Sequence, residues 1–160
     1  LFKIGDYITH PMHGAGVIES IVTKKINGSQ RDYYVLKLPV GDMVVMVPVS
    51  GCEDIGVRSI ISRSEAEKLF GAFSEIEISM TQNCNKRYRE NMDKIKSGNL
   101  LDVASVVKGL MCRDSERGLS TSERKMLHSA KQILISELVI ATDMDYDGVE
   151  KRLCAALKEG

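Results

Sequence analysis

Three aspartates near the carboxyl-terminal end are the side chains best spaced to hold a metal ion. Asp143, Asp145 and Asp147 precede Gly148 in the pattern D-x-D-x-D-G, which is how an EF-hand calcium loop begins. The twelfth position of such a loop requires a bidentate glutamate, and here it holds Cys154. We therefore expect a turn between two helices, with acidic residues at the start of the second helix, where the helix dipole favours them.

The same aspartates could instead serve an enzyme. Residues 139–145 are similar to the Asp-x-Asp turn of Toprim magnesium sites, which requires a strand ending here and a distant glutamate on another strand. Residues 131–138 continue an apolar stripe with helical spacing, and the flanking helices offer no parallel sheet. A metal-dependent nucleic-acid enzyme using Asp143, Asp145 and Asp147 remains the alternative function.

Other residues give little support for catalysis or cofactor binding. His10 and His13 belong to an H-P-M-H sequence followed by Gly14, which favours a tight turn between strands. The chain has no Gly-x-Ser-x-Gly motif and no glycine loop that could cradle a phosphate. We expect a protein that is not an enzyme and holds no metal or cofactor. Four widely spaced cysteines, without a C-x-x-C pair, predict reduced thiols rather than a zinc site: Cys52, Cys84, Cys112 and Cys154.

The charge of this chain is sorted by segment, although its formal net charge is zero. Residues 81–135 contain 11 Lys and Arg against 6 Asp and Glu, a balance of +5. Residues 1–80 contain 8 bases and 10 acids, and residues 136–160 contain 3 bases and 6 acids. A basic segment inside a neutral protein indicates one surface suited to a polyanion.

Helical geometry gathers these bases into faces. At about 100° per residue, Arg124, His128 and Lys131 fall within one sector, with Lys125 beside it. On an earlier helix, Lys86, Arg89 and Lys96 share a face in the same way. Two basic helix faces could contact a phosphate backbone, which supplies affinity without reading sequence. The alternative is an ordinary solvated helix surface.

The elements that carry these residues change type along the chain. Residues 6–58 alternate between apolar and polar, or run in short β-branched stretches, which predicts strands. Asn27-Gly28 favours a tight hairpin turn between two of them. The result is a five-strand antiparallel barrel or sheet.

Helical patterns follow after Ile60. Ser64 and Glu67 have capping-box spacing and predict a short helix over residues 64–73, followed by a polar link to residue 82. Four further helices are expected beyond it. The third opens with a capping box from Ser120 to Glu123, and the last follows Gly148. The fold class is α+β, with residues 1–60 as the β domain and residues 83–160 as a helical domain.

Length and hydropathy favour a soluble protein. With 160 residues and 43% apolar side chains, the chain can bury a core. No apolar run approaches the roughly 18 residues of a membrane span, and the first residues lack the apolar core of a signal peptide. We therefore expect a cytoplasmic protein with no membrane partner.

With these features placed, the chain resembles the CarD/CdnL family of bacterial transcription regulators along nearly its whole length. No single motif decides the match, but their order and spacing make it specific. In the first half they are Phe2-Lys3-Ile4-Gly5-Asp6, His10-Pro11-Met12-His13-Gly14, Tyr34-Val35-Leu36-Lys37, Met46-Val47-Pro48 and Gly56-Val57-Arg58. In the second half they are Lys86-Arg87-Tyr88, residues 113–120 (RDSERGLS) and Glu123-Arg124-Lys125-Met126-Leu127.

The resemblance implies a mechanism in which two domains bind two different partners. A Tudor-like amino-terminal domain, also found in transcription-repair coupling factors, would bind the β subunit of RNA polymerase. A helical carboxy-terminal domain would bind double-stranded promoter DNA near the upstream edge of the melted region, largely independently of sequence, and so modulate open-complex stability. We expect a monomer associated with polymerase at the nucleoid, with a domain-swapped dimer as an alternative. A pure protein-interaction module is a further alternative.

On the polymerase side, the resemblance implies contacts from Lys24, Ile26 and Met46. Lys24 stands where relatives often have Arg, which keeps the charge and loses the planar fork. Met46 departs further, because an apolar side chain cannot make the ionic contact of an Arg. The alternative for Ile26 and Met46 is ordinary packing within the sheet.

On the DNA side, Cys84 occupies the place where many relatives have a Trp that wedges into the minor groove. A Cys side chain is too small to fill an unstacked base step. We therefore expect DNA binding that is weak and sensitive to salt, with open-complex stabilisation reduced or altered in sign. The implied contacts are Lys86, Arg87, Arg89, Arg124 and Lys125, to which the basic helix face adds His128 and Lys131; Arg87 could also anchor the fold.

Overall fold

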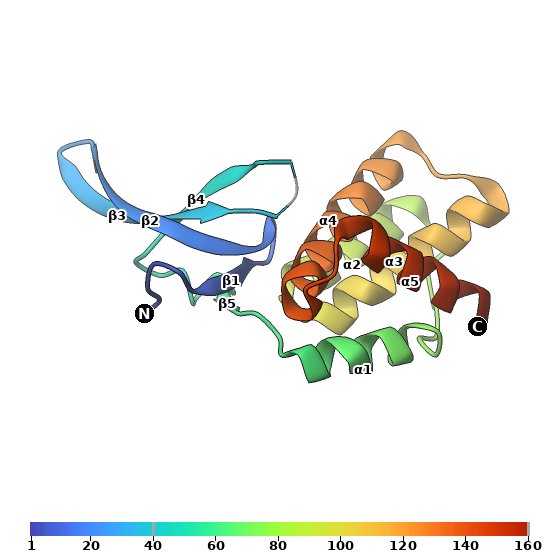
Figure 1. The fold of residues 1–160 in the computed structure, drawn as a ribbon. Helices are drawn as coiled ribbons and strands as arrows, with labels where there is room; N and C mark the ends of the chain where they lie inside the picture. The colour runs from blue at the N-terminus through green and yellow to red at the C-terminus, as the bar shows by residue number, and fades with distance from the viewer. Residues whose placement is uncertain (40, 160) are drawn as a thin grey trace.

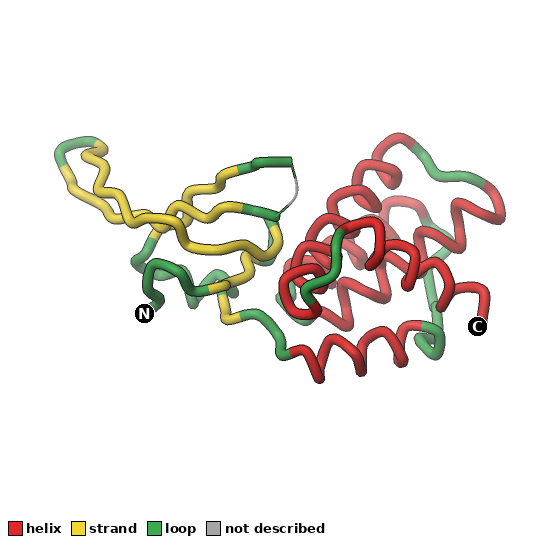
Figure 2. The backbone as a smooth tube through the Cα atoms, viewed as in Figure 1, coloured by secondary structure: helices red, strands yellow, loops and turns green. Residues whose placement is uncertain are grey.

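A computed structural model places a twisted sheet beside a bundle of helices (Figures 1 and 2). It describes residues 1–39 and 41–159, and for Lys158 and Glu159 only the backbone; the helical domain expected over residues 83–160 thus ends on a residue outside the description. The amino terminus lies in the sheet half, and the chain crosses once to the helical half, which contains the carboxyl-terminal end.

The described residues form five antiparallel strands in the order β4-β3-β2-β1-β5. The sheet is open, so of the two predicted forms, barrel or sheet, the sheet is observed. Its last strand contains two residues. The strands are β1 (Tyr7–His10), β2 (Gly14–Ile26), β3 (Ser29–Lys37), β4 (Val44–Pro48) and β5 (Arg58–Ser59).

The long β2–β3 hairpin turns where the sequence predicted. Asn27 and Gly28 both adopt positive φ angles, 51° and 80°, which a tight hairpin turn requires. Beyond this turn the side chains alternate between two faces. The inner face supplies a small core whose fully buried members include Tyr34, Leu36 and Val47, so the outer face of β2, β3 and β4 is left to solvent.

Five helices follow in the described residues: α1 (Arg63–Phe73), α2 (Cys84–Lys96), α3 (Leu100–Arg117), α4 (Thr121–Thr142) and α5 (Tyr146–Glu159). The capping box of α1 uses Ser62 and Glu65, two residues before the predicted pair. The correction has a simple cause: Ser62 is the residue in extended conformation, and its hydroxyl accepts from the amide of Glu65. The last helix likewise begins at Tyr146, before rather than after Gly148.

The core of the helical half is built by α3, α4 and α5 and includes α1. Leu110, Leu134 and Leu153 are almost completely buried, and Phe70 and Phe73 of α1 pack into the same cluster. The segment between α1 and α2 is also fixed to this core. There, the buried ammonium group of Lys108 donates to the carbonyl oxygens of Ser74 and Ile76, each at 2.8 Å.

Among the helices that the structure describes, none combines the length and the apolar character needed to cross a lipid bilayer. The 22-residue α4 is the longest of them, and charged residues occur along it.

Candidate protein and nucleic-acid interfaces

The residues expected to contact polymerase share the outer face of the sheet. Cross-strand partners point to the same side of a sheet, as do alternate residues of one strand. Met46 of β4 pairs with Val35 of β3. Tyr33, two residues before Val35 on the same face of β3, pairs with Val22 of β2. Lys24 and Ile26 continue the same row on β2 by alternation. Ile26 and Met46 are 45% and 37% exposed, so neither is covered by packing within the chain.

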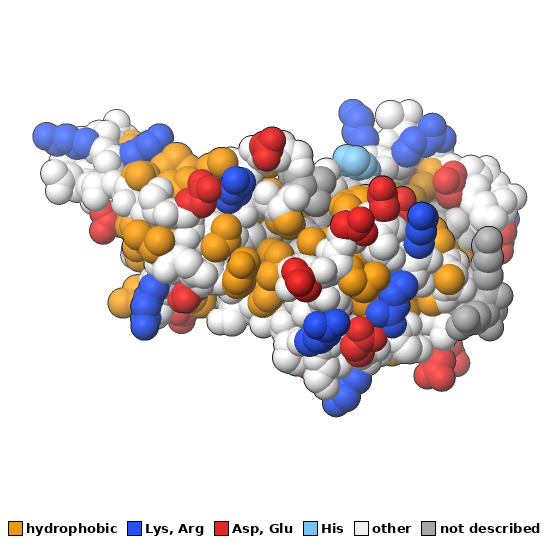
Figure 3. Space-filling model, viewed as in Figure 1, with side chains coloured by type: hydrophobic (Ala, Val, Ile, Leu, Met, Phe, Trp, Pro, Cys, Tyr) orange, Lys and Arg blue, Asp and Glu red, His pale blue; other side chains and the backbone are white. Residues whose placement is uncertain are grey.

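The sheet register adds a residue that the sequence analysis missed. Lys24 lies directly opposite Arg31 on β3, and like charges at that position repel. Neither is within ion-pair distance of an acidic group in the described part of the chain. Figure 3 shows Lys and Arg side chains at the free end of the β2–β3 hairpin, with hydrophobic side chains over the sheet beside them. We call this outer face the sheet surface; it consists of Val22, Lys24, Ile26, Arg31, Tyr33 and Met46.

A second group of bases lies where α2 and α4 begin. Arg87 donates from Nε and Nη2 to the two carboxylate oxygens of Glu123, at 2.8 and 3.0 Å. Its Nη1 donates to the carbonyl oxygens of Thr81 and Gln82 at 3.1 Å. The two charged side chains are 2% and 4% exposed, so this pair joins the first turn of α2 to the first turn of α4 inside the protein.

The prediction that Arg87 contacts DNA therefore needs correction. Its guanidinium is buried and already bonded to Glu123 and two carbonyl groups, and a phosphate cannot reach it without unfolding this corner. The hydrogen bonds from Arg87 lower the pKa of Glu123 below its ordinary value against the effect of burial, and the charge of Arg113 acts in the same direction. The same hydrogen bonds raise the pKa of Arg87. Both groups stay ionised at neutral pH.

The sequence neighbours of the buried pair point outward. Lys86 follows the exposed Cys84 in the first turn of α2, and Arg124 and Lys125 are exposed in the first turn of α4. The helix starts are capped by Asn83 and Ser120, whose side chains accept from the amides of Lys86 and Glu123. Each helix amino terminus also carries a partial positive charge. The helix-start surface is Cys84, Lys86, Arg124, Lys125 and His128.

Three predicted bases contribute less to this surface than their charge suggests. Lys131 is only partly exposed and forms a 3.0 Å ion pair with Glu150 of α5. On α2, Arg89 and Lys96 are exposed as predicted, but Asp93 is exposed between them on the same helix. In Figure 3, Lys and Arg side chains flank a histidine along the upper edge of the helical half, above a region where acidic side chains gather. The positive charge is thus strongest near the helix starts.

The aspartate segment after α4 has a structural use. Asp143 ends α4 in the left-handed conformation, with φ 60°. Asp145 accepts from the amide of Gly148 at 2.8 Å and so caps the first turn of α5. In the part of the chain that the structure describes, no three His, Cys, Asp or Glu side chains are grouped so as to hold a metal ion. Residues 131–138 lie within α4, as predicted, and not in a strand.

Comparison with known families decides which kind of protein has this arrangement. Residues 2–61 match the family described as CarD-like/TRCF RID domain, and residues 68–154 match the family described as CarD, C-terminal domain. The chain belongs to the CarD-like family. Together the two matches span the sheet half and most of the helical half, so the resemblance predicted from the sequence is confirmed.

A curated relative supports the same assignment. Over 140 residues the chain is 37% identical to the Bacillus subtilis (strain 168) protein named "Putative transcription factor YdeB", covering 88% of this chain and 92% of the relative. Membership of the CarD-like family makes this chain a transcription regulator, of a type that is typically not enzymatic. The family of its first domain implies an interaction with RNA polymerase.

Proposed function

We propose that this CarD-like chain binds the β subunit of RNA polymerase through the sheet surface and promoter DNA through the helix-start surface, and thereby changes the stability of the open complex. Residues 1–60 form the polymerase-binding part. Residues 83–160, with α1 packed against them, form the DNA-binding part. The observation that carries the proposal is the presence of two exposed surfaces of different chemistry on the two family-matched halves.

The sheet surface suits a protein partner. Its apolar side chains Val22, Ile26, Tyr33 and Met46 lie on one face and remain at least partly exposed. Burying such an apolar strip against a partner is favourable, because apolar surface is removed from water. The repulsion between Lys24 and Arg31 would be relieved by an acidic group on the partner. Met46 is apolar and cannot make the ionic contact of an Arg, but Arg31 supplies a positive charge on the same face.

The helix-start surface suits a phosphate backbone. Lys86, Arg124 and Lys125 are exposed beside two helix amino termini, and the nearby carboxylate of Glu123 is neutralised by Arg87. The exposed Cys84 stands at the start of α2, where an aromatic wedge would stabilise an unstacked base step. The charge therefore supports binding to the duplex, with little sequence preference.

The experiment measures the lifetime of a promoter open complex with and without the protein. We expect the unaltered chain to change this lifetime and a variant carrying Lys86→Gln, Arg124→Gln and Lys125→Gln to lose most of the effect. Affinity for a promoter fragment should fall between about 50 and 200 mM salt, and the variant should show a shallower dependence, by about one unit of slope per lost phosphate contact.

A matched control carries the same loss of three positive charges elsewhere. Arg63→Gln, Lys68→Gln and Lys151→Gln neutralise exposed bases of α1 and α5, away from the starts of α2 and α4. They should leave the lifetime unchanged. Equal lifetimes for the triple variant and the unaltered protein would remove the DNA half of the proposal, while binding to an isolated fragment of the β subunit would still test the sheet surface. Retention of that binding alone would favour a pure interaction module.

A further inference from the structure

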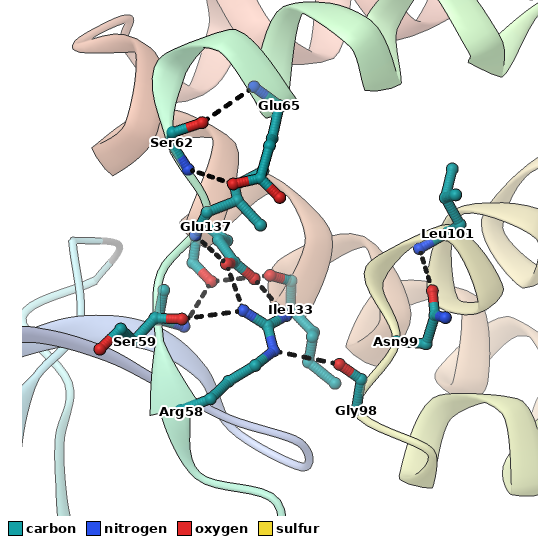
Figure 4. A network of polar contacts seen from close by, with 12 residues as sticks. Arg58, Ser59, Ser62, Glu65, Gly98, Asn99, Leu101, Ile133 and Glu137 are labelled. Atoms are coloured by element: carbon teal, nitrogen blue, oxygen red, sulfur yellow. Dashed lines mark hydrogen bonds and ion pairs between the residues drawn. The ribbon is translucent and has the colours of Figure 1, made fainter.

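The two halves of the protein are joined at the middle of α4 by neighbouring residues, Ser136 and Glu137. The carboxylate of Glu137 is completely buried. It accepts from Nη1 and Nη2 of Arg58 at 2.8 and 3.1 Å, and from the amide of Ile61 at 2.8 Å. Figure 4 shows this carboxylate between the strand that carries Arg58 and the start of α1. One side chain of the helical half therefore holds the segment where the sheet half ends.

Arg58 connects three parts of the chain. It lies in β5, and besides Glu137 it reaches the turn between α2 and α3, where Nε donates to the carbonyl oxygen of Gly98 at 3.2 Å. Nη1 also donates to the carbonyl oxygen of Ser59 at 3.1 Å. The planar guanidinium fixes both directions at once, so a lysine at this position could not reproduce the contacts.

Ser136 makes a second attachment on the other side of β1. Its hydroxyl accepts from the amide of Ala15 in β2 at 2.9 Å and donates to the carbonyl oxygen of Ile133. Gly14 has φ 97°, and a Cβ atom there would lie 3.3 Å from Cα of Ile133, so β2 begins directly against the backbone of α4. Because β2 and β5 flank β1 in the sheet, the two attachments resist rotation of the sheet about α4.

The chemistry of this junction favours a role in orientation. Burying the carboxylate of Glu137 carries a large desolvation cost, which the partly exposed guanidinium of Arg58 offsets only in one geometry, and an apolar pair of similar volume is often as stable. Both partners here are held by directional hydrogen bonds from separate elements. A merely adhesive contact between the halves would not require them.

We propose that Arg58 and Glu137 are positioning residues that hold the sheet surface and the helix-start surface in one fixed arrangement, so that polymerase and DNA are engaged together. This inference rests on the proposed function. Linking two binding surfaces raises the effective concentration of the second contact only if the geometry allows both at once. A fixed arrangement also avoids the loss of orientational freedom on binding. Neither residue needs to touch polymerase or DNA.

The test uses the full-length double variant Arg58→Met with Glu137→Gln. The single Arg58→Met variant would strand a buried carboxylate and could unfold, whereas the amide oxygen of Gln can still accept from the amide of Ile61. The matched control is Arg152→Met with Glu67→Gln. Arg152 donates to both oxygens of Glu67 at 3.1 and 2.9 Å, between α5 and α1 within the helical half.

The first measurement is the orientation of the two halves, from residual dipolar couplings of the backbone amides. In the unaltered protein and in the control, both halves should fit one alignment tensor. In the Arg58→Met/Glu137→Gln variant, we expect two different tensors, with the couplings within each half preserved. One common tensor in that variant would overturn the proposal, because the pair would not set the orientation.

The second measurement compares single and joint binding. The double variant should bind an isolated β-subunit fragment and a promoter fragment as the unaltered protein does, but its effect on open-complex lifetime should fall by about tenfold or more. Unequal tensors with an unchanged lifetime would overturn the positioning role. Failure of the unaltered protein to bind either partner would instead contradict the proposed function. That outcome is distinct from failure of the positioning role, because it is measured on the unaltered protein without any substitution.

Discussion

Arg87 of α2 and Glu123 of α4 form a bidentate ion pair at 2.8 and 3.0 Å, with both side chains almost fully buried. Lys86 and Arg124, the residues next to them in sequence, are exposed. Adjacent bases at the starts of α2 and α4 thus have different tasks, since Arg87 holds the two helices together while its neighbour faces solvent. A charge count along the sequence cannot separate these tasks, but substitutions can.

Arg87→Met should lower the free energy of unfolding by about 3 to 5 kcal/mol, because it leaves the carboxylate of Glu123 buried without its positively charged partner. Urea denaturation followed by circular dichroism measures this loss. Adding Glu123→Gln in the same chain should recover much of it, since the uncompensated charge is then gone. Equal stability of the single variant and the unaltered protein would show that Glu123 finds another partner.

The recovered double variant also serves as the control for DNA binding. If Arg87 only supports the fold, Arg87→Met with Glu123→Gln should keep the salt dependence of promoter binding, because one positive and one negative group are removed from the interior. Lys86→Gln should reduce the slope by about one unit. A reduced slope in the double variant would return Arg87 to the set of DNA contacts.

Acid should destabilise the protein through the same carboxylate. The pKa of Glu123 is lowered in the folded state by the hydrogen bonds from Arg87. The unfolded state therefore binds more protons in this range, and the stabilisation is complete above the ordinary value of 4.5 and lost as the pH falls through the lower folded value. Unfolding free energies at about pH 5, 4 and 3 should fall less steeply in the Arg87→Met/Glu123→Gln variant than in the unaltered protein.

Glu67→Gln provides the comparison. Arg152 also lowers the pKa of Glu67, first through its hydrogen bonds, but this pair lies at the surface, where solvent screens it. The slope of stability against pH should therefore change little. If Glu67→Gln flattens the acid dependence more than the double variant does, the buried pair is not its main source.

Local patterns predicted much of the fold. Asn27-Gly28 forms its turn as predicted because Asn and Gly readily adopt positive φ, which is a local preference that needs no distant contact. Ser120 caps α4 as its spacing with Glu123 predicted. The side chain of Glu123, however, turns to Arg87, which is 36 residues away. Capping-box spacing contains no information about that partner, and so the same carboxylate was predicted correctly in position and incompletely in role.

The candidate sites were harder to predict, because they depend on partners that are distant in the sequence. Lys108 counted as surface charge in the sequence, but it reaches carbonyl groups more than 30 residues earlier and is buried. Arg31 became visible only through the register that sets it opposite Lys24. The contact between Arg58 and Glu137 joins residues 79 apart. Such pairings depend on how elements pack, which periodicity along one segment does not report.

Lys24→Glu should separate stability from polymerase binding. The substitution replaces a cross-strand repulsion opposite Arg31 with an attraction, which should raise the free energy of unfolding by about 0.2 to 1 kcal/mol. Binding to a β-subunit fragment should weaken, because the sheet surface loses a positive charge facing the proposed acidic partner. Thermal unfolding and fragment titration measure the two effects. Lys25→Glu, on the opposite face of the same strand, is the control, and equal weakening by both would argue against the sheet surface.

Cys84→Trp should lengthen the open-complex lifetime relative to the unaltered protein. The exposed position at the start of α2 leaves room for an aromatic side chain, and a ring there can fill an unstacked base step beside the helix-start surface. Cys84→Ala should behave like the unaltered chain, because neither side chain can act as a wedge. A Trp variant with an unchanged lifetime would show that α2 does not approach the edge of the melted region.

Mild acid should weaken the fold through His10, at the end of β1. Burial, and then the charge of His13, lower the pKa of His10 below its ordinary value of 6.5. Its Nδ1 accepts from the amide of Met12 at 3.0 Å, and a proton at that nitrogen would remove the acceptor. Because the unfolded state binds more protons between the folded pKa and 6.5, the free energy of unfolding should fall as the pH drops through this interval. Urea denaturation at about pH 7.5 and 5.5 measures this fall in the free energy of unfolding. His10→Asn should reduce the fall. His128→Asn, a substitution at an exposed position of α4, should leave the fall unchanged. An equal fall in the His10→Asn variant would place the titrating group elsewhere.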